Sequence, residues 1–152
     1  MLVEEILGNI DDMDLENKQI DTVKIEWYEV DKKILKKTSR NGKDVGIRLK
    51  EHKKLNDGDI LYMDDKEALV VDIPDSEALV VKANNMREMG EICYEIGNKH
   101  IPMFLIDNDI VVPFDEPLKK LLDKLGYNAE KENKKLVNGL ECHGHSHSHD
   151  HE

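Results

Sequence analysis

The hydrophobic pattern changes about halfway along the chain, and this change limits the folds that the chain can adopt. Residues 1 to about 73 contain short apolar segments between turn residues, without a sustained helical period. The segments typical of strands are "TVKIEWYEV" (22–30), "DVGIRL" (44–49), "DILYM" (59–63) and "EALVVDI" (67–73). Turn residues separate them at Asn41-Gly42, Asn56-Asp57-Gly58 and Asp64-Asp65. About five or six strands at this spacing predict a small all-β domain over residues 1–74.

From Glu77 onward the pattern is one of strands alternating with helices. "EALVVKA" (77–83) is typical of a strand. Asn85 predicts the N-cap of a helix, and Glu88 follows at the position expected in a capping box. The apolar residues at helical spacing are Met86, Met89, Cys93 and Ile96, and the predicted C-terminal stop is Gly97-Asn98.

The rest of this half predicts a hairpin, a second helix and a last strand. "HIPMFLI" (100–106) and "DIVVPF" (109–114) form the hairpin, and Asp115 caps a leucine-rich helix that ends at Gly126. The polar segment 127–137 predicts an edge strand. The chain is therefore an α+β protein whose second domain, residues 75–138, has the ferredoxin-like order β-α-β-β-α-β. Pro74-Asp75-Ser76 is the predicted linker.

Residues 139–152 form a third segment, which we expect to be a flexible, disordered tail rich in histidine. Five histidines occupy alternate positions there: His143, His145, His147, His149 and His151. A purification tag is normally an unbroken run, whereas this pattern is regularly interrupted. Neutral imidazole is a common ligand for zinc, copper and nickel, so the tail indicates metal binding without indicating which metal. Cys142 either adds a soft ligand or is incidental.

Three candidate residues lie outside the tail. His52 stands among charged residues and is interpreted as an ordinary surface histidine. His100 opens a predicted strand at the rim of its domain, and this position alone favours an ordinary surface histidine. One imidazole makes an incomplete site, but a twofold axis could pair two copies of it. Cys93 and His100 could be a nucleophile and its base, but Cys93 lies on the apolar helix stripe and is better explained as a core residue.

The composition excludes several classes of protein. A net charge of −11 argues against binding to nucleic acid, because affinity for phosphates requires a basic surface. No run of eighteen apolar residues is present, and two cysteines are too few for a secreted disulfide framework. We therefore expect a cytoplasmic protein that does not associate with membranes. No constellation typical of catalysis occurs, so the chain is not predicted to be an enzyme.

The stretch "EICYEIGNKHIPMFLIDNDIVVPFDEPLKKLLDKLGY" (91–127), followed by a histidine-rich tail, resembles the UreE family of urease accessory proteins, which are nickel metallochaperones. The most specific part is Gly97 to Pro102, and the likeness extends over essentially the whole chain. It implies an N-terminal β domain like the peptide-binding domains of chaperones, a ferredoxin-like metal-binding domain, and a homodimer formed through that second domain. It also implies that His100 binds nickel at the dimer interface together with its symmetry mate. Some members carry more metal-binding histidines just after the hairpin, where this chain has none.

The resemblance implies delivery of Ni²⁺ to the urease apoprotein, in concert with other accessory proteins that include a GTPase. We expect His145 and His147 to complete the nickel site, with His143, His149 and His151 as further candidates; Zn²⁺ or Cu²⁺ could bind the same ligands. The main alternative is a cytoplasmic metal storage or buffering protein. The sequence is also compatible with a hydrolytic enzyme that uses a histidine-bound metal, or with a protein-folding chaperone.

Overall fold

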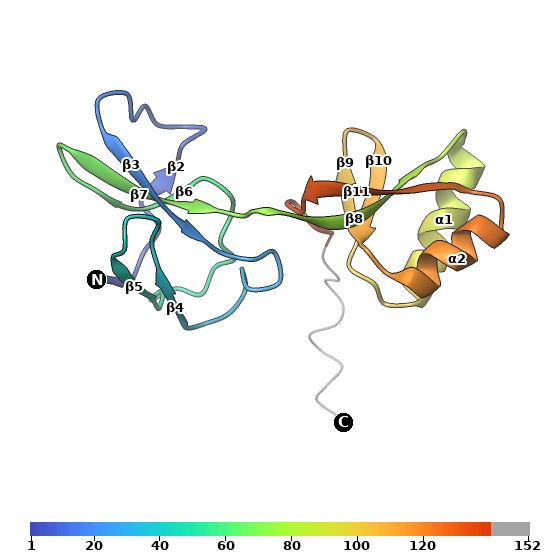
Figure 1. Cartoon of the computed structure of the whole chain (residues 1–152), viewed down its shortest axis with the longest axis horizontal. Coiled ribbons are helices and arrows are strands. Elements are labelled where there is room, and N and C mark those ends of the chain that lie inside the picture. The colour runs from blue at the N-terminus through green and yellow to red at the C-terminus, as the bar shows by residue number, and fades with distance from the viewer. Residues whose placement is uncertain (141–152) are drawn as a thin grey trace. The chain divides into compact units, whose positions relative to one another are not determined.

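A computed structural model of the chain describes residues 1–140 and shows an α+β protein with two helices in that range, in agreement with the predicted class. Cys142 and the five tail histidines lie outside the described residues. The chain divides into two compact units between Pro74 and Asp75 (Figure 1). The N-terminal unit contains strands only, and the C-terminal unit contains strands and both helices.

The N-terminal unit contains two sheets with the strand orders β1-β5-β4 and β2-β6-β7-β3. Its strands are β1 (Leu2–Val3), β2 (Gly8–Asn9), β3 (Gln19–Lys24), β4 (Leu35–Thr38), β5 (Asp44–Ile47), β6 (Asp59–Met63) and β7 (Glu67–Asp72). The predicted turns fall between strands, and Gly42 and Gly58 adopt the positive φ angles that their turns require. Two of the pairings, β1 with β5 and β3 with β7, are parallel. The predicted strand pattern had given no sign of parallel pairing.

The predicted strand over 22–30 was too long at its C-terminal end. β3 ends at Lys24, and the chain then turns over residues 27–31. Glu29 stabilises this turn, because its carboxylate accepts hydrogen bonds from the Glu26 N–H (3.0 Å), three residues earlier, and from Lys37 Nζ (2.7 Å) on β4.

Asp21 connects the two sheets of the N-terminal unit. It is 3% exposed on β3, and its Oδ1 accepts hydrogen bonds from the Thr22 N–H (2.9 Å) and from the Asn41 N–H (3.0 Å) in the β4–β5 turn. Burial raises the pKa of the Asp21 carboxyl, but its hydrogen bonds and the positive charge of Lys43 outweigh burial, so the pKa lies below the ordinary value of 3.8. The folded unit therefore holds this carboxylate in its ionised form.

The C-terminal unit is one antiparallel sheet with both helices on one face. The sheet has the order β11-β8-β10-β9. Its elements are β8 (Asp75–Lys82), α1 (Met86–Asn98), β9 (Phe104–Ile106), β10 (Asp109–Pro113), α2 (Glu116–Lys124) and β11 (Asn128–Lys135). The core between sheet and helices consists of Leu79, Val81, Ile92, Ile96, Ile110, Val112, Leu118, Leu122 and Ala129. The segment 127–137 forms an edge strand as predicted, whereas Asp75 and Ser76, predicted as linker, belong to β8.

Both predicted helix starts are confirmed. Asn85 Oδ1 accepts the Glu88 N–H (2.8 Å), and Asp115 Oδ2 accepts the Leu118 N–H (2.9 Å). Glu88 binds the backbone N–H of Asn84 and not that of Asn85, so the capping box is displaced by one residue. Met86, predicted on the buried stripe of α1, is 87% exposed, because Ile92 and Ile96 are the helix residues that face the sheet.

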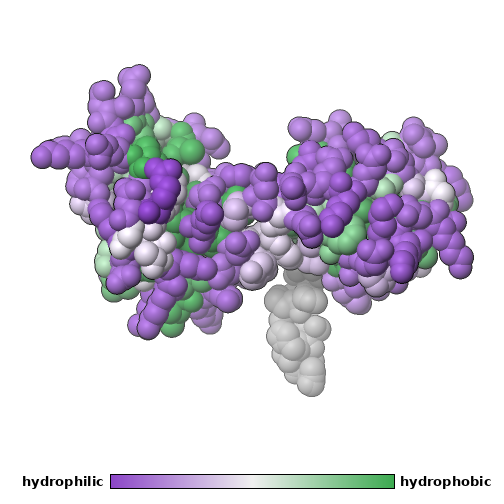
Figure 2. Space-filling view, viewed as in Figure 1, coloured by the Kyte–Doolittle hydropathy of each residue, from purple (hydrophilic) through white to green (hydrophobic). Residues whose placement is uncertain are grey.

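The surface is mainly hydrophilic, with smaller apolar areas on each unit (Figure 2). None of the helices in residues 1–140 combines the length and apolar character needed to cross a membrane.

The first prediction concerns Asp21. Asp21→Ala should reduce the free energy of unfolding of the N-terminal unit by about 1–3 kcal/mol, because two backbone donors lose their acceptor. The folded-state pKa is depressed, so this stabilisation is present above the unfolded pKa of about 3.9 and is lost as the pH falls through the folded pKa. The difference in the free energy of unfolding between the wild type and the variant should therefore decrease as the pH falls from about 5 toward about 2.

Trp27 is the single tryptophan and lies in this unit, so its fluorescence in urea titrations measures the effect. Asp12→Ala, at an exposed position, is the control and should unfold like the wild type. If the free energies of unfolding of the wild type and Asp21→Ala differ by the same amount over the whole pH range, the Asp21 carboxyl does not have a lowered pKa in the folded unit.

Candidate metal centre

His100 lies immediately after the C-terminus of α1. The helix continues through Gly97 and Asn98, which had been predicted to stop it, and ends at the cap residue Lys99. The N–H groups of Lys99 and His100 donate to the carbonyls of Ile96 and Gly97, both at 3.1 Å, and these bonds tighten the last turn. His100 then adopts φ = 57°, the left-handed conformation that usually follows a helix and that glycine most often supplies.

This conformation corrects the prediction that His100 opens a strand. β9 begins only at Phe104, so five residues, 99–103, form a loop between α1 and β9. Pro102 lies in this loop and lacks the N–H that a ladder needs. A non-glycine residue in the left-handed region is uncommon, although histidine is enriched there, and such residues are often found at functional sites.

The imidazole of His100 is available to bind a metal ion. The residue is exposed, and its side chain forms no hydrogen bond or ion pair with any other residue in the range 1–140. It also stands at the negative end of the dipole of α1, where a positive charge is stabilised. The last turn of α1 has no basic residue, and the basic residue nearest to this end in the sequence is the C-cap Lys99.

The C-terminal tail begins beside the loop that contains His100. Gly139 forms an antiparallel bridge with Phe104, and the Leu140 N–H donates to the Met103 carbonyl (2.9 Å). Leu140 is the last described residue. His145 follows it by five residues, a reach of at most about 18 Å, while Met103 is three residues from His100. The tail histidines are therefore within reach of His100, although their positions lie outside the described residues.

Residues 1–140 by themselves do not form a complete metal site. No group of three or more His, Cys, Asp or Glu side chains in this range is arranged to hold an ion. His52 is an exposed loop residue, as predicted, with its Nε2 3.0 Å from Asp31 Oδ1. Any site that includes His100 needs ligands from the tail, from a second copy of the chain, or from both.

Cys93 does not resemble a nucleophile. Its side chain packs against the helix–sheet core, and its Sγ lies 3.9 Å from Met89 Sδ. Burial raises the pKa of the Cys93 thiol above its ordinary value of 9.0, so the reactive thiolate is disfavoured. The interpretation of Cys93 as a core residue agrees with this environment.

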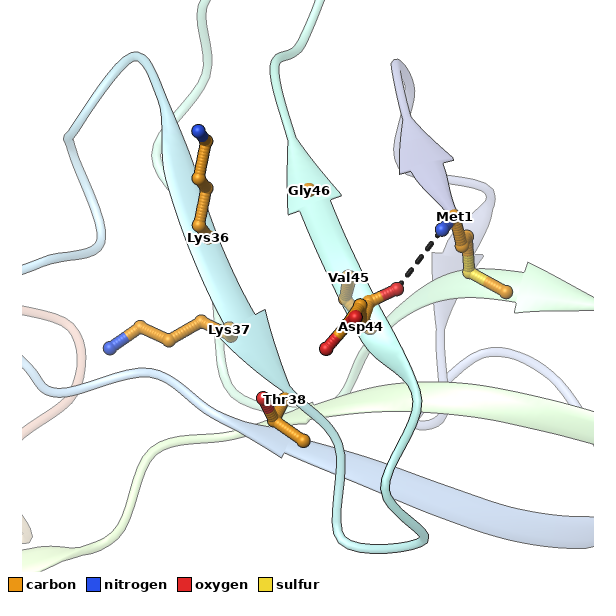
Figure 3. Close-up of a pocket in the computed structure, with 7 residues that line it drawn as sticks. All are labelled: Met1, Lys36, Lys37, Thr38, Asp44, Val45 and Gly46. Carbon is orange, nitrogen blue, oxygen red and sulfur yellow. Dashed lines mark hydrogen bonds between the residues drawn. The ribbon is translucent and has the colours of Figure 1, made fainter.

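The N-terminal unit contains a pocket that the sequence pattern does not predict. It is lined by Met1, Lys36, Lys37, Thr38, Asp44, Val45 and Gly46, and the amino group of Met1 donates to the Asp44 carbonyl at 3.0 Å (Figure 3). Sequence spacing gives no signal for it, because strands β1, β4 and β5 meet there only in the fold. The lining contains no imidazole or thiolate, so the pocket does not suit a transition metal.

The chain is similar to known proteins over nearly its whole length. Residues 3–73 match the family model of the N-terminal domain of the UreE urease accessory protein, and residues 76–152 match that of its C-terminal domain. A urease accessory protein UreE of Acetivibrio thermocellus is 48% identical over 99% of this chain and 100% of that protein. A UreE of Flavobacterium johnsoniae is 43% identical over 96% of this chain and 92% of that protein. A UreE of Helicobacter pylori is 39% identical over 90% of this chain and 82% of that protein.

The second prediction tests the conformation of His100 in the absence of metal. His100→Gly should keep or slightly raise the melting temperature, because glycine adopts the left-handed conformation without strain. His100→Val should lower the stability by about 1–2 kcal/mol, because a β-branched residue is strained there. Thermal melts in the presence of a chelator measure both variants. An unchanged melting temperature for His100→Val would contradict the left-handed assignment.

Proposed function

The chain belongs to the UreE family of urease accessory proteins, and on this premise we propose that it is a cytoplasmic, nickel-binding metallochaperone that delivers Ni²⁺ to the urease apoprotein. A role in urease maturation follows from the family. One observation supports the nickel step: His100, whose imidazole has no partner in residues 1–140, lies in the loop beside which the histidine-rich tail begins.

Nickel would be held by His100 and by imidazoles of the tail, His145 and His147 first, with His143, His149 and His151 as further ligands. Neutral imidazole is a suitable ligand for Ni²⁺, and alternate histidines in an extended segment project to the same side. Tethering the tail to the His100 loop raises the local concentration of imidazole to the millimolar range that is typical of short linkers. Such ligands bind one ion together and can dissociate from it one after another, which delivery of the ion requires.

A homodimer would bring two His100 side chains to one ion, and the surface of α1 supports this arrangement. Met86, Gly90, Tyr94 and Gly97 share one helix face by their spacing, and all of them are exposed. Tyr94 is 69% exposed, and side chains added at Gly90 or Gly97 would meet no atom within 4 Å. Two large exposed side chains, Met86 and Tyr94, thus alternate with two glycines along a face that leads to His100. A second copy of the chain packed on it would place the two imidazoles near a common axis.

The two units would have different functions. The order β11-β8-β10-β9 with two helices on one face supports a ferredoxin-like domain at residues 75–138, which we assign to metal binding and dimerisation. Residues 1–74 contain one histidine, His52, and no cysteine. We therefore assign them to contact with protein partners, the urease apoprotein and the accessory GTPase.

The third prediction concerns His100 as a nickel ligand. His100→Gly should remove the tightest nickel-binding event while weaker binding by the tail remains, because the fold tolerates glycine at this position. Calorimetric titration with Ni²⁺ measures the change, and His52→Gly is the matched control at the other histidine of residues 1–140. If the tightest event is unchanged in His100→Gly, His100 is not the primary ligand.

The fourth prediction concerns the tail. A chain that ends at Leu140 should remain folded but bind fewer nickel ions, and its remaining site should be weaker, because the tethered imidazoles are gone. Both forms should lose nickel as the pH falls from about 7.5 to about 5.5, since a ligating histidine must be deprotonated. Equilibrium dialysis gives the stoichiometry, and equal capacity in both chains would contradict a role for the tail.

Activation of urease apoprotein in a reconstituted assay separates delivery from storage. The nickel-loaded chain should activate the apoprotein faster than the same amount of free Ni²⁺ in the presence of a competing chelator. Normal nickel binding without such activation would instead identify a storage protein.

A further inference from the structure

The segment between β11 and the tail crosses from one edge of the sheet to the other. β11 and β9 are the outer strands, and Lys135 at the end of β11 pairs with Asp75 of β8. Four residues later, Gly139 pairs with Phe104 of β9. The chain could have entered the tail directly from β11, but it first reaches the opposite edge.

The contacts of this segment hold it in place on the sheet. Leu136 is 2% exposed, Asn138 adopts φ = 60°, and the Leu140 N–H donates to the Met103 carbonyl. Gly139 lies against the ring of Phe104, which is itself buried. A Cβ atom at Gly139 would come within 2.9 Å of Phe104 Cε2. The absence of a side chain at residue 139 is therefore a requirement for this approach.

We propose that residues 136–140 are a clasp that carries the base of the histidine-rich tail across the sheet and holds it beside the His100 loop. The proposal rests on the proposed function in that the tail histidines share an ion with His100. The clasp is not a ligand; it is a positioning element that shortens the tether. Gly139 and its contact with Phe104 are the critical part.

The expected size of the effect follows from the length of the tether. With the clasp closed, five residues lead from Leu140 to His145; with it open, nine lead from the buried Leu136. The effective concentration of a flexible tether falls roughly as the −3/2 power of its length, so opening the clasp should lower it about two- to threefold.

A nitroxide label on Cys142 tests the clasp without metal. In a Cys93→Ala background, Cys142 is the single cysteine, two residues beyond Leu140. The label should broaden the amide NMR signals of Ile101, Met103 and Leu105, with Gly126 as a distant reference. Gly139→Val should reduce this broadening about two- to threefold, as the longer tether lowers the local concentration of the label, whereas Asn138→Gly, which suits the left-handed conformation, should preserve it. The remaining amide signals of each variant show whether the unit is folded, and Gly139→Ala provides a milder variant if Gly139→Val does not fold.

Nickel affinity, measured by calorimetry on full-length chains, links the clasp to the metal. Gly139→Val should weaken the tail-dependent event about two- to threefold. Inserting Gly-Ser-Gly-Ser between Cys142 and His143 also lengthens the tether from five residues to nine with the clasp intact. It should weaken binding to a similar extent, yet leave the broadening unchanged.

Broadening that is undiminished in both Gly139→Val and Gly139→Ala would overturn the proposal, and so would reduced broadening with unchanged nickel affinity. The proposed function fails on a different result: a chain ending at Leu140 that binds nickel as tightly as the full chain. In that case the spin label would still report the position of the tail base.

Discussion

Each unit is organised around a central strand that is buried on both faces. β7 and β8 share the residues EALVV, and in both strands the four residues from alanine to the second valine are buried. A strand of this kind needs neighbours at both edges and cover on both sides, because fully burying each Val or Leu side chain is worth about 1.5–3 kcal/mol. β7 obtains its neighbours from β6 and β3, and β8 from β10 and β11. The strands β3, β6, β10 and β11 therefore take their positions from these two strands.

In the C-terminal unit, this constraint places the candidate metal ligand. Leu79 and Val81 of β8 face the helices, and Ile92 and Ile96 of α1 pack against them. Ile96 is in the last full turn of α1, so the buried part of the helix extends almost to its end. The chain must then reverse toward β9, and the left-handed turn at His100 makes this reversal. The packing thus leaves the imidazole exposed at the negative end of a helix dipole, where a cation is favoured.

The proposed nickel site would combine a fixed ligand with adaptable ones. His100 is positioned by a packed helix, whereas the tail histidines follow a segment fixed at Gly139 and Leu140 on the sheet edge. A rigid cage of protein ligands would bind an ion tightly and release it slowly. One fixed imidazole with tethered partners would form and lose its bonds stepwise, which suits the proposed transfer of nickel to another protein.

The sequence alone determined where a pattern of strands changes to one of strands and helices. It also determined both helix caps, the edge strand β11 and the hairpin of β9 and β10. These features depend on local patterns of apolar, capping and turn residues. The resemblance pointed to His100, and the composition pointed to the tail. Only the tertiary structure decided the parallel pairings of β1 with β5 and of β3 with β7, which join segments far apart in the chain. It also decided that His100 ends a helix and does not open a strand, and that Gly139 must lack a side chain. The physical reason is that a local pattern records which side chains are buried, whereas pairing, chain reversal and close backbone approach depend on where distant segments meet.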